Sequence, residues 1–519
     1  MARFRSAVPA AALAAAAVLI SSGCTTSSEP SAGGGGPFRY AATSDANTFD
    51  PALGTAATDY SLARMQFGTL VYRDADQSVV PGLAERWTAA PDSATFTLRA
   101  GLTCSDGKPL TAGDVAASLR RWADPKTGAA GTGLAFGPGA KVAVSSDDAA
   151  RTVTVKLAGP WSDLVPAMSM TNAGIVCPPG LKDPKALGQG PVAGAGTGPY
   201  TLTDVQRGRQ YTFKLRDGYN AFPAYEKAKV PAGERPSAVR LSIVSNESTA
   251  ANQLSTGELD YAAFTGPDAA RFAGGGYHVH VQPLLRMFVV FNERKGHPGA
   301  DPGFRKAVAQ ALDPAAFNKV YGGKGEVLKS WSDGTSPCAN TDASIVTGTD
   351  QAAAKKALNG VSVKLSGTNG VAGGSGNTYV QEALRAAGAK VALRNVDNAT
   401  WASDVLANKG DWDVTVMAHL NFQGTLTAGA ILLTGPNPPE GRNFGGIRNG
   451  GFDTGFAKAM ATTDEAGKCA AWGEAQKALL RRDDVVPLST VPVAFVLGKN
   501  ADAVVTAGAV DPTSFRVQG

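Results

Sequence analysis

The sequence predicts an α/β protein with more than one lobe, and three observations support this fold class. The chain has 519 residues, which is more than one hydrophobic core usually holds. Strand-like and helix-like segments alternate from about residue 361 onward, as in a partly parallel sheet. Two strands and a capped helix are also expected between Leu83 and Arg120.

The N-terminus has the organisation of a secretory signal. Arg3 and Arg5 precede an apolar run from Ala7 to Ile20, which is too short to span a membrane. Small residues then lead to Cys24, as in a lipobox, although Ser21 stands where a leucine is usual. We expect a signal peptide over residues 1–23, a lipidated Cys24 and a flexible polar tether that continues to residue 36. An ordinary secreted protein, in which Cys24 lies near the cut by coincidence, is the alternative.

Charge and composition argue against two classes of protein. The formal net charge is +5, and loss of Arg3 and Arg5 with the signal leaves a mature chain near +3. No basic patch stands out, so nucleic-acid binding has no electrostatic support. No later segment is apolar over the length that a membrane-spanning helix needs.

The segment from Leu83 to Arg120 is expected to contain a hairpin followed by a helix. Apolar residues alternate with polar ones over residues 94–99, which predicts a strand with one buried face. Thr111 and Asp114 form a capping box at the start of the helix. The residues expected on its buried face are Val115, Leu119 and Trp122.

The second half of the chain contains repeated α/β units. Strands are expected over residues 361–365, 391–396 and 414–417, and helices over residues 379–387 and 401–407. A glycine-rich loop, Gly370–Gly376, follows the first strand and could hold a phosphate at a helix N-terminus. It lacks both the Lys-Ser/Thr ending and the dinucleotide spacing, so a flexible strand-to-helix turn is favoured over nucleotide binding.

Short motifs spread over nearly the whole mature chain carry a family resemblance. In chain order they are Thr48–Pro51, Phe67–Tyr72, Leu83–Trp87, Phe96–Leu102, Asp106–Ala112, Gly196–Tyr200, Arg216–Asn220, Leu254–Asp260, Phe291–Asn292, Phe304–Val308 and Leu312–Asp313. Each motif is weakly specific alone, but together and in this order they resemble the peptide/nickel (family 5) solute-binding proteins of bacterial ABC importers. Most of these residues are expected to be scaffold, since Phe304, Val308 and Leu312 recur at helical spacing.

The resemblance implies a two-lobed, periplasmic-binding-protein-like fold of type II, with an extra subdomain inserted in the first lobe. The expected parts are lobe I over residues 37–80, 194–290 and 485–519, the inserted subdomain over residues 81–193, and lobe II over residues 291–484. Such a protein is expected to be a monomer that closes around its solute by a hinge movement.

The cysteines beyond Cys24 are consistent with an oxidising compartment. They are Cys104, Cys177, Cys338 and Cys469, at long spacings and with no C-x-x-C pair for metal or redox chemistry. Three disulfide connectivities are possible, and free buried thiols are a further alternative. The implied domains place the first two cysteines in the inserted subdomain and the last two in lobe II, so we expect the bridges Cys104–Cys177 and Cys338–Cys469. Bridges between the lobes would obstruct closure.

Enzyme signatures are missing from the sequence. It contains no H-E-x-x-H, G-x-S-x-G or G-x-x-x-x-G-K-[ST] motif. His278 and His280 would share one face of a strand, but no carboxylate or thiolate lies nearby in the sequence, so an ordinary strand pair is favoured over a metal site. We expect no catalytic residue, no metal and no cofactor.

The resemblance places the solute between the lobes, beyond the carboxyl ends of the strands. In peptide-binding members, the loop after the strand that here ends at Met417 resembles Gly-Trp-x-x-Asp, and its Asp holds the α-amino group of the peptide. This chain has Ala418-His419-Leu420-Asn421-Phe422, with Asn421 or Phe422 in place of the acid. Because a buried ammonium needs a carboxylate, a neutral or N-blocked solute is an alternative to a free peptide.

The candidate ligand-binding residues come from both lobes. Aromatic residues are candidates for stacking, and Arg286 could bind a carboxylate. The full set is His419, Asn421, Phe422, Phe444, Trp331, Arg286, Tyr60, Ser44 and Thr43.

The implied function is that of a substrate-binding protein of an ABC importer. It would be lipid-anchored at Cys24 on the extracytoplasmic face of a bacterial cell membrane, capture a peptide or similar small solute, and deliver it to permease subunits with cytoplasmic ATPases. A surface lipoprotein that senses its ligand without transport is the first alternative. A secreted hydrolase is disfavoured by the missing nucleophile and metal motifs.

Overall fold

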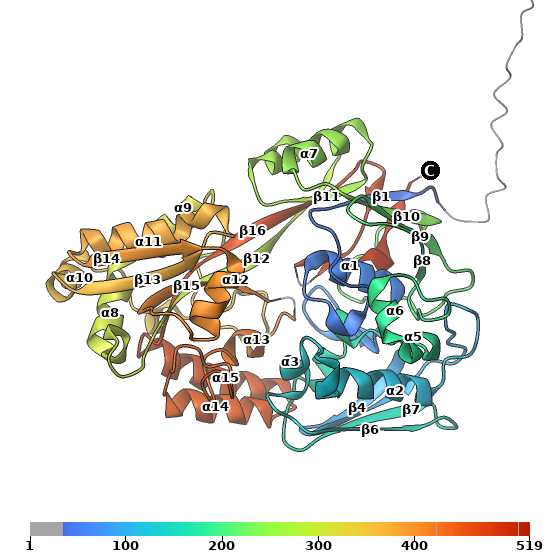
Figure 1. Ribbon diagram of the computed structural model, residues 1–519, viewed down its shortest axis with the longest axis horizontal. Coiled ribbons are helices and arrows are strands. Elements are labelled where there is room, and N and C mark those ends of the chain that lie inside the picture. The colour runs from blue at the N-terminus through green and yellow to red at the C-terminus, as the bar shows by residue number, and fades with distance from the viewer. Residues whose placement is uncertain (1–34, 422, 507, 519) are drawn as a thin grey trace, which may run out of the picture.

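The computed structural model describes residues 35–421, 423–506 and 508–518. The predictions for the signal peptide, for lipidated Cys24 and for most of the tether concern residues outside these ranges. The described residues form two lobes joined by one ten-stranded sheet (Figure 1). In spatial order its strands are β14 (Lys390–Val396), β13 (Ser362–Thr368), β15 (Val414–Leu420), β12 (His278–Phe291), β16 (Val485–Leu497), β11 (Tyr261–Phe264), β1 (Phe38–Ala42), β10 (Ala238–Ile243), β9 (Gln210–Leu215) and β8 (Tyr200–Gln206).

Lobe I is assembled from both ends of the chain. Strand β1 lies between β10 and β11 and is parallel to both. Helix α1 (Ala57–Gln66) packs against β8, and helix α7 (Glu247–Thr256) packs against β11. Near the end of the chain, Phe515 stacks on Phe38 with ring centroids 3.9 Å apart. Short strand pairs border this core: β2 (Val71–Arg73) with β3 (Val79–Pro81), β17 (Ala501–Asp502) with β20 (Arg516–Val517), and β18 (Val505–Thr506) with β19 (Ala509–Val510).

The inserted subdomain contains a separate four-stranded sheet in the order β4 (Ala84–Ala90), β5 (Ser93–Leu98), β7 (Thr152–Leu157) and β6 (Val142–Asp147). The predicted capping box is confirmed: Thr111 and Asp114 exchange hydrogen bonds at the start of α2 (Ala112–Ala123). The predicted buried face of α2 is also confirmed. The remaining helices are α3 (Thr132–Phe136), α4 (Leu164–Ala167), α5 (Pro178–Lys182) and α6 (Pro184–Gln189).

Lobe II contains the predicted α/β units. Strand β13 is parallel to β14 and β15, whereas β12 runs antiparallel to β15, so the sheet is partly parallel as expected. Its helices are α8 (Pro302–Ala311), α9 (Pro314–Val320), α10 (Gln351–Leu358), α11 (Ser375–Ala386), α12 (Asn398–Trp401), α13 (Thr427–Ala430), α14 (Gly450–Met460) and α15 (Glu465–Leu480).

Two helix starts in lobe II come earlier than predicted. Helix α11 begins at Ser375, directly after Gly374, whose φ of 83° is readily available only to glycine. The expected loop is therefore a tight strand-to-helix turn. The carboxylate of Asp397 accepts backbone hydrogen bonds from Ala399 and Thr400, so α12 starts at Asn398, before the predicted residue 401.

Both predicted disulfides are confirmed. Cys104 is bonded to Cys177, and Cys338 is bonded to Cys469. Each bridge lies within the part of the molecule to which the sequence assigned it, and neither joins the two lobes.

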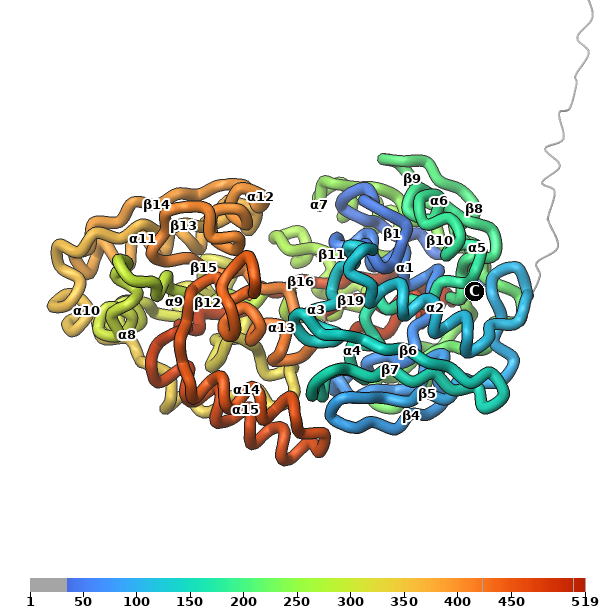
Figure 2. Tube along the Cα trace, turned by 60° about the horizontal axis from the view of Figure 1, so that its bottom comes forward, coloured from blue at the N-terminus to red at the C-terminus, as the bar shows by residue number. Residues whose placement is uncertain are grey.

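Strands β12 and β16 connect the lobes and pair with each other along almost their whole length. In lobe I, β16 also pairs with β11, and in lobe II, β12 also pairs with β15. The β12–β16 ladder shifts register between Pro283 and Leu285 and again between Arg286 and Phe288. The first shift lies between the part of the ladder in lobe I and the residues of β12 that pair with β15, and the second lies within the latter. Figure 2 shows β12 and β16 between the two lobes. In the part of the chain that the structure describes, no helix is long and apolar enough to cross a membrane.

Candidate ligand-binding site between the lobes

The two lobes touch along a surface that we call the interlobe seam. On the side of lobe I it comprises Gln77, Ser162, Asp163 and Met170, and on the side of lobe II it comprises Gln423, Gly424, Ala459, Met460 and Lys468. Both views show α13 of lobe II beside α3 of the inserted subdomain (Figures 1 and 2). The carboxyl end of β15 opens toward this surface, as expected for the binding crevice of such a sheet.

The inserted subdomain contacts the helical layer of lobe II. The backbone N–H of Ser162 donates to Met460 O at 2.9 Å, and its hydroxyl donates to Ala459 O at 2.9 Å. Beside them, Lys468 forms an ion pair with Asp163, whose side chain is 6% exposed. These polar contacts hold lobe II against the inserted subdomain and not against the rest of lobe I.

The loop after β15 forms the second part of the seam. The amide of Asn421 donates to Thr425 O at 3.0 Å and to Ser336 Oγ at 3.2 Å, which holds the loop against its own lobe. Gly424, with φ of 60°, packs so closely on Gln77 that an added Cβ would lie 2.3 Å from Gln77 Oε1. Any larger residue at Gly424 would therefore displace the side chain of Gln77.

The turn that carries Gln77 is fixed by one carboxylate. Asp74 accepts backbone hydrogen bonds from Glu226, Lys227 and Ala228, which tie the hairpin of β2 and β3 to a long loop of lobe I. These bonds hold the pKa of Asp74 below its usual value against the opposing effect of burial.

Buried polar atoms on both sides of the seam lack hydrogen-bond partners among the described residues. They are Arg73 Nε and Gln77 Oε1 in lobe I, and His419 Nδ1 and Thr425 Oγ1 in lobe II. A buried polar atom without a partner costs about 1–3 kcal/mol. Other such atoms lie away from the seam, for example Gln253 Oε1 in lobe I and Ser366 Oγ in lobe II. The atoms at the seam are candidate hydrogen-bonding groups for a solute, and they include a donor and an acceptor in lobe I.

His419 is buried and neutral. Burial is the largest cause that lowers its pKa to about 4, and the positive charges of Arg286 and Arg442 act in the same direction. Arg286 forms an ion pair with Asp333, and both side chains are almost completely buried. The guanidinium of Arg286 is therefore already engaged within lobe II.

The structure places the other predicted site residues as follows. Trp331 is fully buried, donates its indole N–H to Leu426 O at 3.0 Å, and packs against Trp472. Phe444 is buried 6.0 Å from the ring of Trp412. Thr43, Ser44 and Tyr60 lie in lobe I near the carboxyl end of β1, where Ser44 contacts Thr58. Phe422 falls outside the described residues, and ligand contact by any of these residues stays a prediction.

Sequence reasoning missed Arg73 and Gln77. Arg73 directly follows the motif Phe67–Tyr72, which we interpreted as scaffold, and Gln77 lies in the turn that comes next. Arg73 is only 9% exposed. A buried arginine after a short strand carries no signal of its own in the sequence.

The histidine pair on β12 has a neighbour that the sequence did not reveal. Asp502 lies 3.6 Å from His278 Nδ1 and 3.5 Å from His280 Nε2. A carboxylate therefore does lie near the histidine pair in the folded protein. The sequence did not reveal it, because Asp502 is more than 200 residues later in the chain. Among the described residues, no group of three or more His, Cys, Asp or Glu side chains has the arrangement of a metal site.

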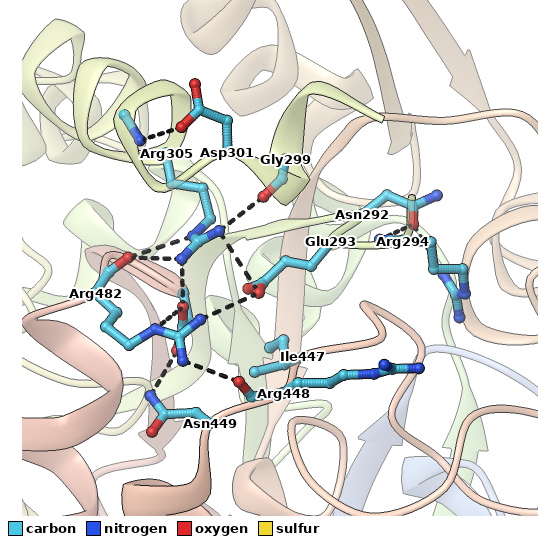
Figure 3. Close-up of polar contacts among 12 residues, drawn as sticks. Asn292, Glu293, Arg294, Gly299, Asp301, Arg305, Ile447, Arg448, Asn449 and Arg482 are labelled. Carbon is cyan, nitrogen blue, oxygen red and sulfur yellow. Dashed lines mark hydrogen bonds and ion pairs between the residues drawn. The ribbon is translucent and has the colours of Figure 1, made fainter. Parts of the chain in front are cut away.

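A second polar cluster lies beyond the end of β12 that is distal to lobe I (Figure 3). Arg305 bridges Asp484 at 2.9 Å and Glu293 at 3.6 Å, and Arg482 lies 3.4 Å from Asp484. Burial and the charge of Asp484 raise the pKa of Glu293 to about 8. Since this cluster lies away from the seam, we treat it as part of the scaffold of lobe II.

Comparison with known proteins identifies relatives of this chain. The family model for the middle region of bacterial extracellular solute-binding proteins, family 5, matches residues 78–429, more than half of the chain. Protein XP55 of Streptomyces lividans is 30% identical over 54% of this chain and 49% of its own length, so the chain spans about half of that relative. The probable D,D-dipeptide-binding periplasmic protein DdpA of Escherichia coli is 24% identical over 84% of this chain and 85% of that protein.

One solved structure is similar over nearly the whole described chain. It is a substrate-binding protein from Microbacterium hydrocarbonoxydans, complexed with 4-hydroxybenzoate hydrazide. The sequence identity is 37%, the TM-score is 0.79, and the match covers 93% of this chain and 100% of that chain. The two-lobed fold of type II expected from the sequence is therefore confirmed.

Proposed function

The chain belongs to family 5 of the bacterial extracellular solute-binding proteins, and we propose that it is the lipid-anchored receptor of an ABC importer. It captures a peptide or similar small solute between its lobes, closes by a hinge movement at β12 and β16, and delivers the solute to permease subunits with cytoplasmic ATPases. It performs no catalysis. It acts on the extracytoplasmic face of the cell membrane.

The observation that carries this proposal is the set of unpartnered polar atoms at the interlobe seam. Arg73 Nε and Gln77 Oε1 belong to lobe I, whereas His419 Nδ1 and Thr425 Oγ1 belong to lobe II. A solute that bonds to both sets is bound fully only when the lobes are together, so its binding energy favours closure. The two strands that join the lobes supply a hinge, since they are continuous and irregular at the crossing.

The relative with 37% identity favours a non-peptide solute as a second candidate. Its solved complex contains 4-hydroxybenzoate hydrazide, a small aromatic acyl compound. The loop Ala418–Asn421 of this chain also lacks an acid for the amino group of a peptide. We therefore include small aromatic acyl compounds with peptides among the proposed solutes.

Calorimetric titration with trialanine and with 4-hydroxybenzoate hydrazide tests the capture step. Binding of either compound should raise Tm and lower the radius of gyration measured by X-ray scattering, because the closed form is stabilised. The variant His419→Gln should bind at least tenfold more weakly at pH 7, while its Tm without ligand changes little, since His419 is neutral there. His280→Gln, on β12 in lobe I, is the matched control.

Failure of both compounds to bind, together with failure to recover any solute from protein purified from its own host, would contradict the receptor function. Unchanged affinity in His419→Gln would remove the loop after β15 from the site.

Anchoring and transport need separate measurements in cells. Cys24→Ala should release the protein from the membrane fraction, because it removes the thiol that would be acylated. Uptake of a bound, labelled solute should fall in cells that lack this chain and should return when it is supplied. A strain without the chain that imports the solute at the normal rate would favour the sensing lipoprotein over the transport receptor.

A further inference from the structure

The connection between the lobes has a narrow part that consists of two strands only. Strand β15 begins to pair with β12 at Leu285, and β11 pairs with β16 only from Ala494 onward. Among the described strands, no third strand therefore pairs with residues 282–284 of β12 or with residues 491–493 of β16. We call these residues the hinge ribbon. A two-stranded ladder has fewer hydrogen bonds than the wider sheet on either side, so bending should concentrate there.

A loop of lobe II pairs with β16 directly beside the hinge ribbon. The backbone N–H of Thr490 donates to Glu326 O at 2.9 Å. Val327 and Ser489 form an antiparallel bridge next to this bond, at the second register shift of the β12–β16 ladder. We call residues 325–336 the hinge strap, because they border the hinge ribbon on its lobe II side.

Arg286 connects the hinge ribbon to the hinge strap. Its guanidinium donates to Pro283 O at 3.2 Å and to Leu284 O at 3.4 Å, both in the ribbon. The same guanidinium forms an ion pair with Asp333 of the strap, and Asp333 also accepts the backbone N–H of Thr335 at 2.9 Å. The side chains of Arg286 and Asp333 are 3% and 0% exposed. Because separation of a buried ion pair leaves two uncompensated charges, the two side chains should move together.

The hinge strap is also bonded to the loop after β15. The amide of Asn421 donates to Ser332 Oγ at 3.3 Å and to Ser336 Oγ at 3.2 Å. Asn421 in turn accepts the backbone N–H of Thr425 at 3.3 Å. Ser332 is next to Asp333 in the chain, so the strap contacts the hinge and the loop through adjacent residues.

We infer that the hinge strap couples bending of the hinge to the shape of the loop after β15, with Arg286 and Asp333 as its positioning residues. This inference rests on the proposed receptor function, in which that loop takes part in solute binding. When the ribbon bends, the carbonyl groups that Arg286 binds change direction, and the buried ion pair passes this change to Ser332 and Asn421. A solute that orders the loop therefore favours one hinge angle, and closure favours one arrangement of the loop. Arg286 and Asp333 act through the loop and not through contact with the solute.

Hydrogen exchange of one amide reports contact between the lobes without any solute. The backbone N–H of Ser162 donates to Met460 O across the interlobe seam, so it is protected only while the lobes touch. Asp333→Asn should accelerate its exchange at least fivefold, because the charge of the pair is lost while the shape of the side chain is kept. Local loosening of the strap alone would leave Ser162, in the inserted subdomain, unchanged. Asp404→Asn, which removes the partner of Arg394 elsewhere in lobe II, is the matched control.

A double-variant cycle tests whether the contacts act in series. Asn421→Ala removes the bond between the strap and the loop and should also accelerate exchange at Ser162. If a single chain of contacts is involved, Asp333→Asn/Asn421→Ala should exchange within about twofold of the faster single variant, whereas independent effects would multiply. Ser332→Ala/Ser336→Ala leaves the buried ion pair intact and should match Asn421→Ala. It keeps the inference testable if Asp333→Asn folds poorly.

Binding measurements extend the test to the solute. Calorimetry uses 4-hydroxybenzoate hydrazide and trialanine as probes. Whichever of them binds the parent should bind Asp333→Asn at least fivefold more weakly and should bind Asp404→Asn as it binds the parent.

The inference is overturned if Ser162 exchanges at the parent rate in both Asp333→Asn and Ser332→Ala/Ser336→Ala, or if the effects in the cycle multiply. It is also overturned if a bound probe keeps its affinity in Asp333→Asn, or if the Ser162 amide is unprotected in the parent with and without a probe. Each of these results would leave the receptor function intact. Failure of both probes to bind, with no solute recovered from the host, would contradict the receptor function, and the exchange rates would still decide whether the strap controls contact between the lobes.

Discussion

Glu293 shows how a single carboxyl in the scaffold can set the pH dependence of stability. Its pKa in the folded protein is raised from 4.5 to about 8 by burial and by neighbouring Asp484, whose own pKa is also raised. Between pH 4.5 and about pH 8, Glu293 is therefore protonated in the folded state and ionised in the unfolded state. The free energy of unfolding contributed by this group therefore falls as the pH rises from about 4.5 to about 8.

Replacement of this carboxyl should flatten the pH profile. Glu293→Gln keeps the shape of the side chain and cannot ionise, so its stability relative to the parent should increase from pH 5 to pH 8.5. Denaturant unfolding at these two pH values measures the difference. Glu382→Gln, in an exposed ion pair on α11, is the control and should not change the slope. Parallel profiles for Glu293→Gln and the parent would show that Glu293 ionises normally.

For individual residues, the sequence identified candidate positions more readily than the side chains that contact them in the folded protein. The loop after β15 was found because it departs from a family motif, and His419 there does have an unpartnered nitrogen. Arg286 was expected to be available for a carboxylate, but Asp333 occupies it from 47 residues away. Trp331 was expected to stack on a ligand, but helices α14 and α15 surround it. Such partners are set by tertiary contacts that no local pattern encodes.

Helices and strands were predicted better than individual contacts, because local patterns determine them. The capping box at Thr111 and the buried stripe of α2 follow from spacing alone. The early start of α11 was missed because glycines at positions 373 and 374 were assigned to a loop, whereas they form its N-terminal turn.

The capping box gives a prediction for one helix. Thr111→Ala removes the hydroxyl that accepts the backbone N–H of Asp114 at 3.1 Å. The first turn of α2 should lose about 1 kcal/mol of stability. Hydrogen exchange of the amides of residues 113–116 should accelerate about fivefold, which corresponds to that free energy. Ser145→Ala, on exposed β6, should change none of these rates, and unaltered exchange in Thr111→Ala would show that the cap is not needed.

For the whole molecule, the ion pair between Lys468 and Asp163 should influence the balance of open and closed forms. Lys468 is in α15 of lobe II and Asp163 is in the inserted subdomain, so this ion pair forms only when the two lobes are in contact. Lys468→Met should therefore shift the molecule toward the open form and weaken binding of a solute at least tenfold, with little change in the stability of each lobe.

X-ray scattering of the unliganded protein measures this shift as an increase in the radius of gyration. The double variant Asp163→Asn/Lys468→Met should recover part of the closed population, because it also removes the carboxylate that would otherwise be left without its lysine. A radius of gyration that is the same in Lys468→Met and the parent would show that closure does not depend on this pair.

The path of the chain through lobe I also has a consequence for biosynthesis. Strand β11 pairs with β16, and Phe38 of β1 stacks on Phe515, so these strands complete their packing only against a segment that is made much later. A chain exported from its N-terminus can finish lobe II, which is almost one continuous segment, while lobe I still waits for residues 485–517. Vectorial folding of lobe I thus depends on residues 485–517, and a chain truncated before them should leave β1 and β11 exposed to extracytoplasmic proteases.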